Sequence, residues 1–148
     1  FFGMPSQMKA TTDRCLPFML PYMGNLVEDK NASFHELRDE SMHEKRLVVI
    51  TTCGYVDEKP MYPALLKQLD LIAGEGHYTA ILCPEGELFI ADKAKRQREG
   101  YLAEITRAGA EFAQNRALSE ETKKRIAKPI LSPKGFETIT LAHWGMNK

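Results

Sequence analysis

The sequence has few of the features that place a protein in a specialised class. It has no excess of either charge, because 20 lysines and arginines balance 20 aspartates and glutamates among its 148 residues. Without a net positive charge, no overall field attracts nucleic acid or an anionic membrane. No apolar run approaches the roughly 20 residues of a membrane-spanning helix, and no signal peptide is evident. The composition therefore predicts a cytoplasmic protein without nucleic-acid or membrane partners.

Cysteine is also scarce. Cys15, Cys53 and Cys83 are widely spaced in apolar surroundings, which predicts reduced, buried thiols rather than a disulfide framework. A zinc or iron–sulfur site requires closely spaced ligand pairs, and the cysteines provide none. The four histidines also lack a common ligand spacing: they are His35, His43, His77 and His143. We therefore expect no metal site.

The clearest periodic pattern is a strand, a helix and a second strand. Residues 47–50 form a continuous, mostly β-branched run, typical of a parallel strand buried on both faces. Residues 78–83 form the second strand. Between them, Pro60 can open a helix and Gly74 can end it, with a buried stripe of Met61, Leu65, Leu69 and Ile72. This order predicts adjacent parallel strands joined by a right-handed crossover.

Helical spacing also occurs on either side of this unit. A first helix from residue 4 should stop near Leu16 because Pro17 removes a backbone donor. A long helix should span about 92–117, and another should begin after Ser119 and end before Pro129. A long connection occupies 23–45. The composition suits a single α/β domain over 1–148. Two strands cannot form a doubly wound sheet, so we expect further strands from upstream sequence or from another chain.

The strongest motif lies at the start of the chain and runs Phe2-Gly3-Met4-Pro5-Ser6-Gln7-Met8-Lys9-Ala10, followed by Asp13-Arg14. It resembles the segment after the third strand of flavodoxin-like NAD(P)H-dependent oxidoreductases, a group of FMN reductases, quinone reductases and iron–sulfur flavoproteins. Gly3 would let the backbone approach a flat ring, and the following helix N-terminus presents free amides. The sequence departs from the family at Thr11 and Thr12, where bulky apolar residues are usual.

A second motif, Thr51-Thr52-Cys53-Gly54-Tyr55, ends the first predicted strand. Ligands of open α/β sheets bind outside such strand ends. In the family that the chain resembles, this loop contacts the pyrimidine side of the flavin through its backbone. Gly54 would permit a tight turn, and Tyr55 would flank the ring. Cys53 has no nearby basic residue to activate its thiol, so packing or backbone contact is its expected role.

The resemblance implies a flavodoxin-like three-layer parallel sheet, present as a C-terminal part that lacks the upstream loop for the FMN phosphate. It implies an FMN-dependent oxidoreductase that passes electrons from NAD(P)H to a quinone, flavin or other acceptor, with no catalytic side chain. The unpaired backbone of the two strands predicts a homo-oligomer. The implied cofactor-binding residues are Phe2, Gly3, Met4, Pro5, Ser6, Thr52, Cys53, Gly54 and Tyr55. The alternatives are an electron-transfer protein without reductase activity, and a fragment that no longer binds flavin.

Two further charged segments are expected to be solvated surface without a chemical role. Glu85 and Glu87 flank Gly86 after the second strand, and we expect a solvated turn rather than acid–base chemistry. The basic run 93–98 is expected to be a solvated helix face. The ending from Ser132 to Trp144 loosely resembles the C-terminal segment of the same family.

Overall fold

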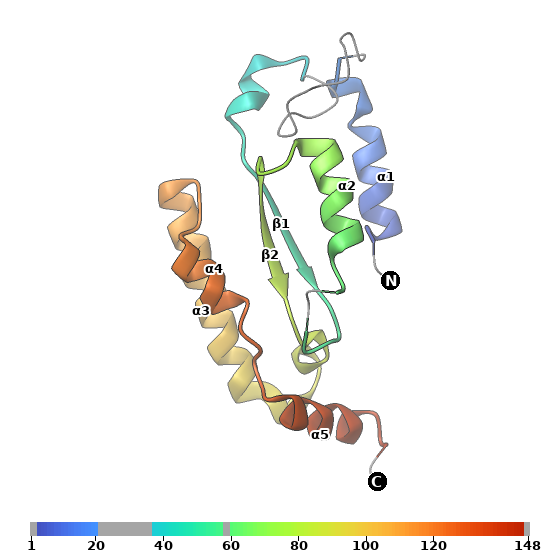
Figure 1. The fold of residues 1–148 in the computed structure, drawn as a ribbon, viewed down its shortest axis with the longest axis vertical. Helices are drawn as coiled ribbons and strands as arrows, with labels where there is room; N and C mark the ends of the chain where they lie inside the picture. The colour runs from blue at the N-terminus through green and yellow to red at the C-terminus, as the bar shows by residue number, and fades with distance from the viewer. Residues whose placement is uncertain (1–2, 21–36, 58–59, 147–148) are drawn as a thin grey trace. The chain divides into compact units, whose positions relative to one another are not determined.

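The described residues contain two parallel strands, with helices before, between and after them along the chain (Figure 1). The structure, a computed structural model, describes residues 3–20, 37–57 and 60–146. The helices are α1 (Ser6–Arg14), α2 (Pro63–Ala73), α3 (Lys95–Asn115), α4 (Glu120–Ile126) and α5 (Pro133–His143), and the strands are β1 (Leu47–Thr52) and β2 (Tyr78–Cys83). Short 3-10 turns occupy Leu16–Phe18, Glu40–Glu44, Gly86–Phe89 and Asp92–Ala94.

The predicted strand–helix–strand unit is confirmed. β1 and β2 are neighbours in a two-stranded sheet, and α2 connects them. α2 begins at Pro63 rather than Pro60, because Pro63 occupies the first helical position. It ends at Gly74, whose φ of 89° suits glycine. The fold of the described residues is α/β, and they contain no third strand. A flavodoxin-like three-layer sheet is expected from the resemblance alone.

The expectation that the first strand is buried on both faces was wrong. Only Val49 of β1 is buried, and Ile50 is 61% exposed. A run of apolar side chains indicates which residues seek burial, but it does not supply the elements that cover them.

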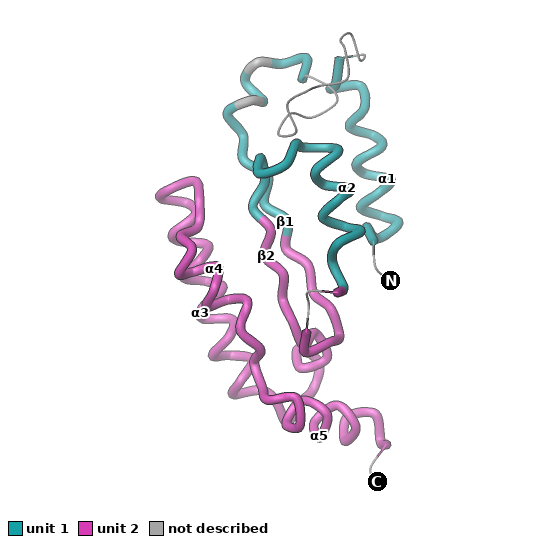
Figure 2. Tube along the Cα trace, viewed as in Figure 1, with its two compact units in different colours: residues 1–49, 61–79 teal, residues 50–60, 80–148 magenta. Residues whose placement is uncertain are grey.

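The chain divides into two compact units, residues 1–49 with 61–79 and residues 50–60 with 80–148 (Figure 2). In the first unit, α2 buries Leu65 and Leu69. The hydroxyl of Tyr78 donates to Asp70 Oδ1 at 2.8 Å, and burial together with this carboxylate raises the pKa of Tyr78 to about 12. These contacts fix the start of β2 against α2.

The first helix ends at Arg14, as Pro17 predicted, and a 3-10 turn that contains Pro17 follows. No residue of α1 is buried. Cys15 is exposed as well, contrary to the prediction of buried thiols; Cys53 is half-buried and Cys83 is buried, and none of the three forms a disulfide among the described residues.

In the second unit, a small core forms where the turns after β2 meet the C-terminal segment. Its buried residues are Leu88, Ala91 and Ala94, and the partly buried residues packed on them are Ile130, Leu131, Phe136 and Ile139. The C-terminal segment from Ser132 to Trp144 contains the helix α5. The Ser132 hydroxyl caps its first turn by accepting a hydrogen bond from the Gly135 amide at 3.2 Å.

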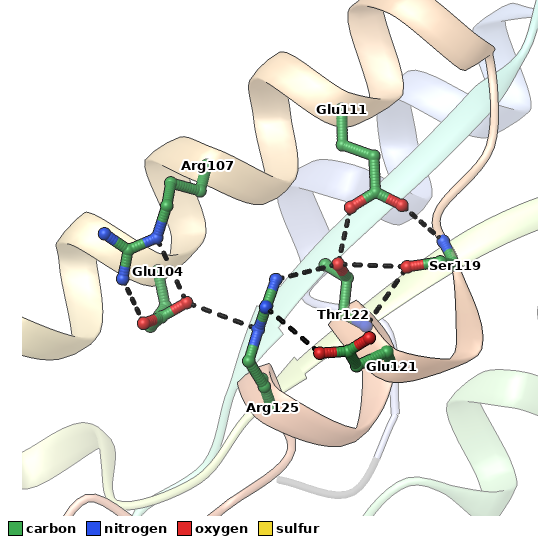
Figure 3. A network of polar contacts seen from close by, with 7 residues as sticks. All are labelled: Glu104, Arg107, Glu111, Ser119, Glu121, Thr122 and Arg125. Atoms are coloured by element: carbon green, nitrogen blue, oxygen red, sulfur yellow. Dashed lines mark hydrogen bonds and ion pairs between the residues drawn. The ribbon is translucent and has the colours of Figure 1, made fainter.

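α3 and α4 of the same unit are joined by a polar network (Figure 3). Ser119 caps α4, as the sequence predicted. Glu111 of α3 accepts hydrogen bonds from the Thr122 hydroxyl and the Ser119 amide, and these bonds lower the pKa of the Glu111 carboxyl. Arg125 of α4 forms ion pairs with Glu104 at 3.5 Å and with Glu121 at 3.6 Å. The hydroxyl of Tyr101 adds a buried bond to the Ile126 carbonyl at 2.9 Å.

None of the helices in the described ranges is both long enough and apolar enough to cross a membrane.

Candidate functional site

The loop after β1 and the loop after β2 are held together by backbone hydrogen bonds within the second unit. The amide of Cys53 donates to the Cys83 carbonyl at 3.1 Å. The amide of Gly86 then donates to the Cys53 carbonyl at 2.6 Å, and the amide of Glu85 donates to the Tyr55 carbonyl at 2.9 Å. The carboxyl ends of two parallel strands thus form one edge, which is where open α/β sheets bind ligands.

Glu85 is the most unusual residue of this edge. Its side chain is fully buried, and its φ of 55° is left-handed, which is uncommon for a residue other than glycine. Its Oε2 accepts hydrogen bonds from the amides of Ile130 and Leu131, the second at 3.0 Å. Its Oε1 is buried and has no hydrogen-bond partner among the described residues. The predicted solvated turn is therefore wrong for Glu85.

Burial raises the pKa of the Glu85 carboxyl above its ordinary value, although the two backbone donors oppose this shift. Strained backbone and a buried acidic group are features that concentrate at functional sites, and they also occur in purely structural networks. The geometry alone shows that one carboxylate oxygen binds the 130–131 backbone.

Glu87 lies on the other side of Gly86 and is partly exposed. Its Oε2 accepts a hydrogen bond from Trp144 Nε1 at 3.2 Å, and its Oε1 would lie 3.4 Å from a Cβ on Gly54. Gly54 has no positive φ, so its turn does not depend on glycine as the sequence had suggested. The space beside Gly54 is instead limited by the side chain of Glu87.

Arg98 corrects the prediction for the basic run 93–98. This residue is partly buried, and its Nη1 donates to the Phe89 carbonyl at 2.8 Å and to the Leu88 carbonyl at 3.3 Å. It therefore ties α3 to the turn after β2. The two lysines of the run, Lys93 and Lys95, are exposed as predicted.

The predicted residues of the β1 loop lie on this edge. Thr52 and Gly54 are exposed, Tyr55 is 54% exposed and Cys53 is half-buried. The thiol of Cys53 lies 3.7 Å from the Tyr55 carbonyl, which agrees with a packing role. Among the described residues, the amides of Gly54 and Tyr55 donate no hydrogen bond. Gly54 and the side chain of Tyr55 therefore lie on the exposed part of this edge.

The predicted residues Gly3, Met4, Pro5 and Ser6 belong to the first unit, and Phe2 lies outside the described residues. The amide of Met4 donates to Gln68 Oε1 of α2 at 3.3 Å. α1 then begins at Ser6, with no side-chain cap and no acidic residue in its first turn. Its first amides are therefore free to donate to an acceptor. The structure thus places the two predicted groups in different units.

Each of these two groups, taken within its own unit, has donors that suit one part of FMN. Exposed amides at Gly54 and Tyr55, and the uncapped first turn of α1, are suitable donors for the carbonyl oxygens and nitrogens of an isoalloxazine ring. No glycine-rich or Ser/Thr-rich phosphate loop occurs in the sequence. The described residues also hold no group of three or more His, Cys, Asp or Glu side chains arranged for a metal ion.

Sequence reasoning missed Glu85 as a site residue. The local signal was its position between a buried strand, Pro84 and Gly86, but turns also contain such residues on the surface. Its burial depends on amides 45 and 46 positions further along the chain. A shallow pocket of about 230 Å³ lies elsewhere in the second unit and is lined by Ala91, Asp92, Lys93, Ile139, Ala142 and His143.

Comparison with known proteins adds no assignment: no protein-family model, curated protein or solved structure matches this chain.

Proposed function

We propose that the protein is an FMN-dependent oxidoreductase that passes electrons from NAD(P)H to a quinone, a flavin or another small acceptor. The observation that carries the proposal is the paired edge at the ends of β1 and β2, where the backbone of Cys53 is bonded to the next loop and the neighbouring Gly54 and Tyr55 are exposed. The motif from Phe2 to Ala10, which resembles the flavin loop of flavodoxin-like oxidoreductases, supports the same assignment.

In this proposal, the protein positions the cofactor and does not act as an acid or base. When bound, FMN supplies the two-electron redox chemistry. The amides of Gly54 and Tyr55 would hold the ring system, and the Tyr55 side chain would lie beside it. Gly3 to Ser6 belong to the other unit, and their assignment to the cofactor comes from the resemblance of their motif; within that unit, Met4 is anchored by Gln68. Cys53 contributes its backbone, since its thiol faces the Tyr55 carbonyl.

The direct test uses the full-length protein, including any residues encoded before Phe1. Purified protein should show flavin absorbance after reconstitution with FMN and should oxidise NADH or NADPH when a quinone is added. Flavin binding without NAD(P)H oxidation would favour the alternative of an electron-transfer protein. The absence of flavin binding would refute both.

Gly54→Val tests the role of the β1 loop. A valine side chain would meet the flexible end of Glu87, which can move aside, but it would also cover the exposed amides of residues 54 and 55. We expect FMN affinity to fall about tenfold or more while the unfolding midpoint changes little. Gly100→Ala in α3 is the control, since it lies outside the β1 loop and its added Cβ meets nothing within 4 Å. Equal losses of affinity and stability would indicate a packing role for this loop.

We also propose that the protein forms a homo-oligomer through β1. Its exposed apolar residues, Leu47 and Ile50, and the few strands of the sheet favour self-association into a homo-oligomer.

A further inference from the structure

Glu85 connects three segments of the second unit that are far apart in the sequence. Its amide donates to the Tyr55 carbonyl, and its Oε2 accepts from the amides of Ile130 and Leu131. The next residue, Gly86, donates to the Cys53 carbonyl. The same two residues therefore hold the β1 loop through their backbone and the C-terminal segment through one side chain.

The left-handed backbone of Glu85 makes these bonds mutually dependent. A glutamate at φ 55° is disfavoured unless other contacts hold it there. The contacts of Oε2 with residues 130 and 131 are the side-chain bonds that hold it. If they are lost, the residue can relax toward a common backbone conformation, and the amides of Glu85 and Gly86 then turn away from the β1 loop.

We infer that Glu85 is a positioning residue for the β1 loop, because its buried acceptor oxygen fixes the backbone turn that holds Cys53 and Tyr55 in place. The inference rests on the proposed function for its consequence, which is that Glu85 sets the flavin-contacting geometry without touching the flavin. The required property is an acceptor at Oε2. The negative charge is not required, since Oε1 has no partner among the described residues.

Three substitutions of Glu85 separate the effects of its acceptor oxygen, its negative charge and its left-handed backbone. Glu85→Gln keeps an oxygen that can accept both amides and removes the charge. Glu85→Met has a similar length and removes the acceptor. Glu85→Gly also removes the acceptor but adopts a positive φ without strain, so it provides a folded comparison if Glu85→Met fails to fold.

Amide hydrogen exchange measured by NMR distinguishes a positioning role from a local one. In Glu85→Met, we expect the amides of Cys53 and Gly86 to exchange about tenfold faster or more, together with those of Ile130 and Leu131. Glu85→Gln should restore exchange to within about twofold of the wild type, because one acceptor serves both amides. Glu85→Gly should speed exchange at residues 130 and 131 and leave Gly86 closer to the wild-type rate.

FMN titration of the same full-length variants supplies the functional readout. We expect affinity to fall in Glu85→Met and to be rescued in Glu85→Gln. Faster exchange confined to Ile130 and Leu131 in Glu85→Met would overturn the inference, as would unchanged FMN affinity alongside faster exchange at Cys53. If the wild type binds no FMN, the proposed function fails, but the exchange pattern still decides whether Glu85 positions the β1 loop.

Discussion

The amide of Gly86 donates to the Cys53 carbonyl at 2.6 Å, and a Cβ on residue 86 would lie only 3.0 Å from the same oxygen. The two strand-end loops approach this closely because residue 86 has no side chain. The obstacle is backbone, which cannot rotate aside as the end of a flexible side chain can.

Gly86→Ala should therefore destabilise the protein. We expect a loss of about 1–3 kcal/mol in the free energy of unfolding, since either loop must shift to admit the methyl group. Urea denaturation followed by circular dichroism measures this loss. The matched control is Gly109→Ala in α3, where the added Cβ meets nothing within 4 Å. That control should gain about 0.5–1 kcal/mol because alanine favours the helix. A neutral Gly86→Ala variant would show that the loops separate easily.

The pH dependence of stability should carry the signature of Glu85. Burial raises the pKa of this carboxyl in the folded protein above the value of 4.5 that it would have when unfolded. A raised folded pKa gives a stabilising contribution that is complete below the unfolded pKa and is lost as pH rises through the folded pKa. The free energy of unfolding of the wild type, minus that of Glu85→Gln, should therefore decrease as pH rises above about 4.5.

Denaturant titrations at closely spaced pH values between acid and neutral conditions test this slope, because the subtraction cancels the contributions of the other carboxyls. A difference that increases with pH would mean that the two backbone donors outweigh burial, and that Glu85 is held as a stabilised anion.

Ser119→Ala should weaken the junction of α3 and α4. The Ser119 hydroxyl accepts from the Thr122 amide at 3.3 Å, and it also contacts the Thr122 hydroxyl. Loss of such an N-cap costs about 1 kcal/mol. Thr106→Ala is the control, because Thr106 is exposed in α3 and its hydroxyl only contacts the Leu102 carbonyl one turn earlier. Differential scanning calorimetry should show a lower midpoint for Ser119→Ala alone. Equal midpoints for the two variants would contradict the capping role.

Self-association should depend on β1. Ile50 is 61% exposed on this strand, and Ile90 is 60% exposed outside the sheet. A lysine on an exposed strand opposes edge-to-edge pairing. We expect Ile50→Lys to reduce the mean molar mass measured by light scattering, while Ile90→Lys leaves it unchanged. An equal effect of both variants would indicate nonspecific apolar contact, and a monomeric wild type would remove the basis of the homo-oligomer proposal.

The elements that were predicted correctly carry local signals. The end of α2 at Gly74 and the start of α4 at Ser119 each depend on a residue whose own conformation or side chain ends or begins a helix. The ordering of β1, α2 and β2 likewise follows from apolar periodicity and the need for a crossover.

The features that the sequence did not reveal depend on distant residues. The burial of Glu85 requires the amides of residues 130 and 131, and no pattern near residue 85 encodes that contact. The exposure of Ile50 and of the apolar residues of α1 reflects which surfaces lie opposite them. For the candidate site, sequence reasoning identified the β1 loop but missed the residue that holds it.

The boundaries between the two compact units fall after residues 49, 60 and 79, so the chain passes from one unit to the other three times. Two of these passages lie inside β1 and β2. Neither unit corresponds to one continuous stretch of the gene. No single cut of the sequence, in recombination or in the design of an expressed fragment, therefore separates one complete unit from the other. The two strands are thus expected to be inherited, and to evolve, together.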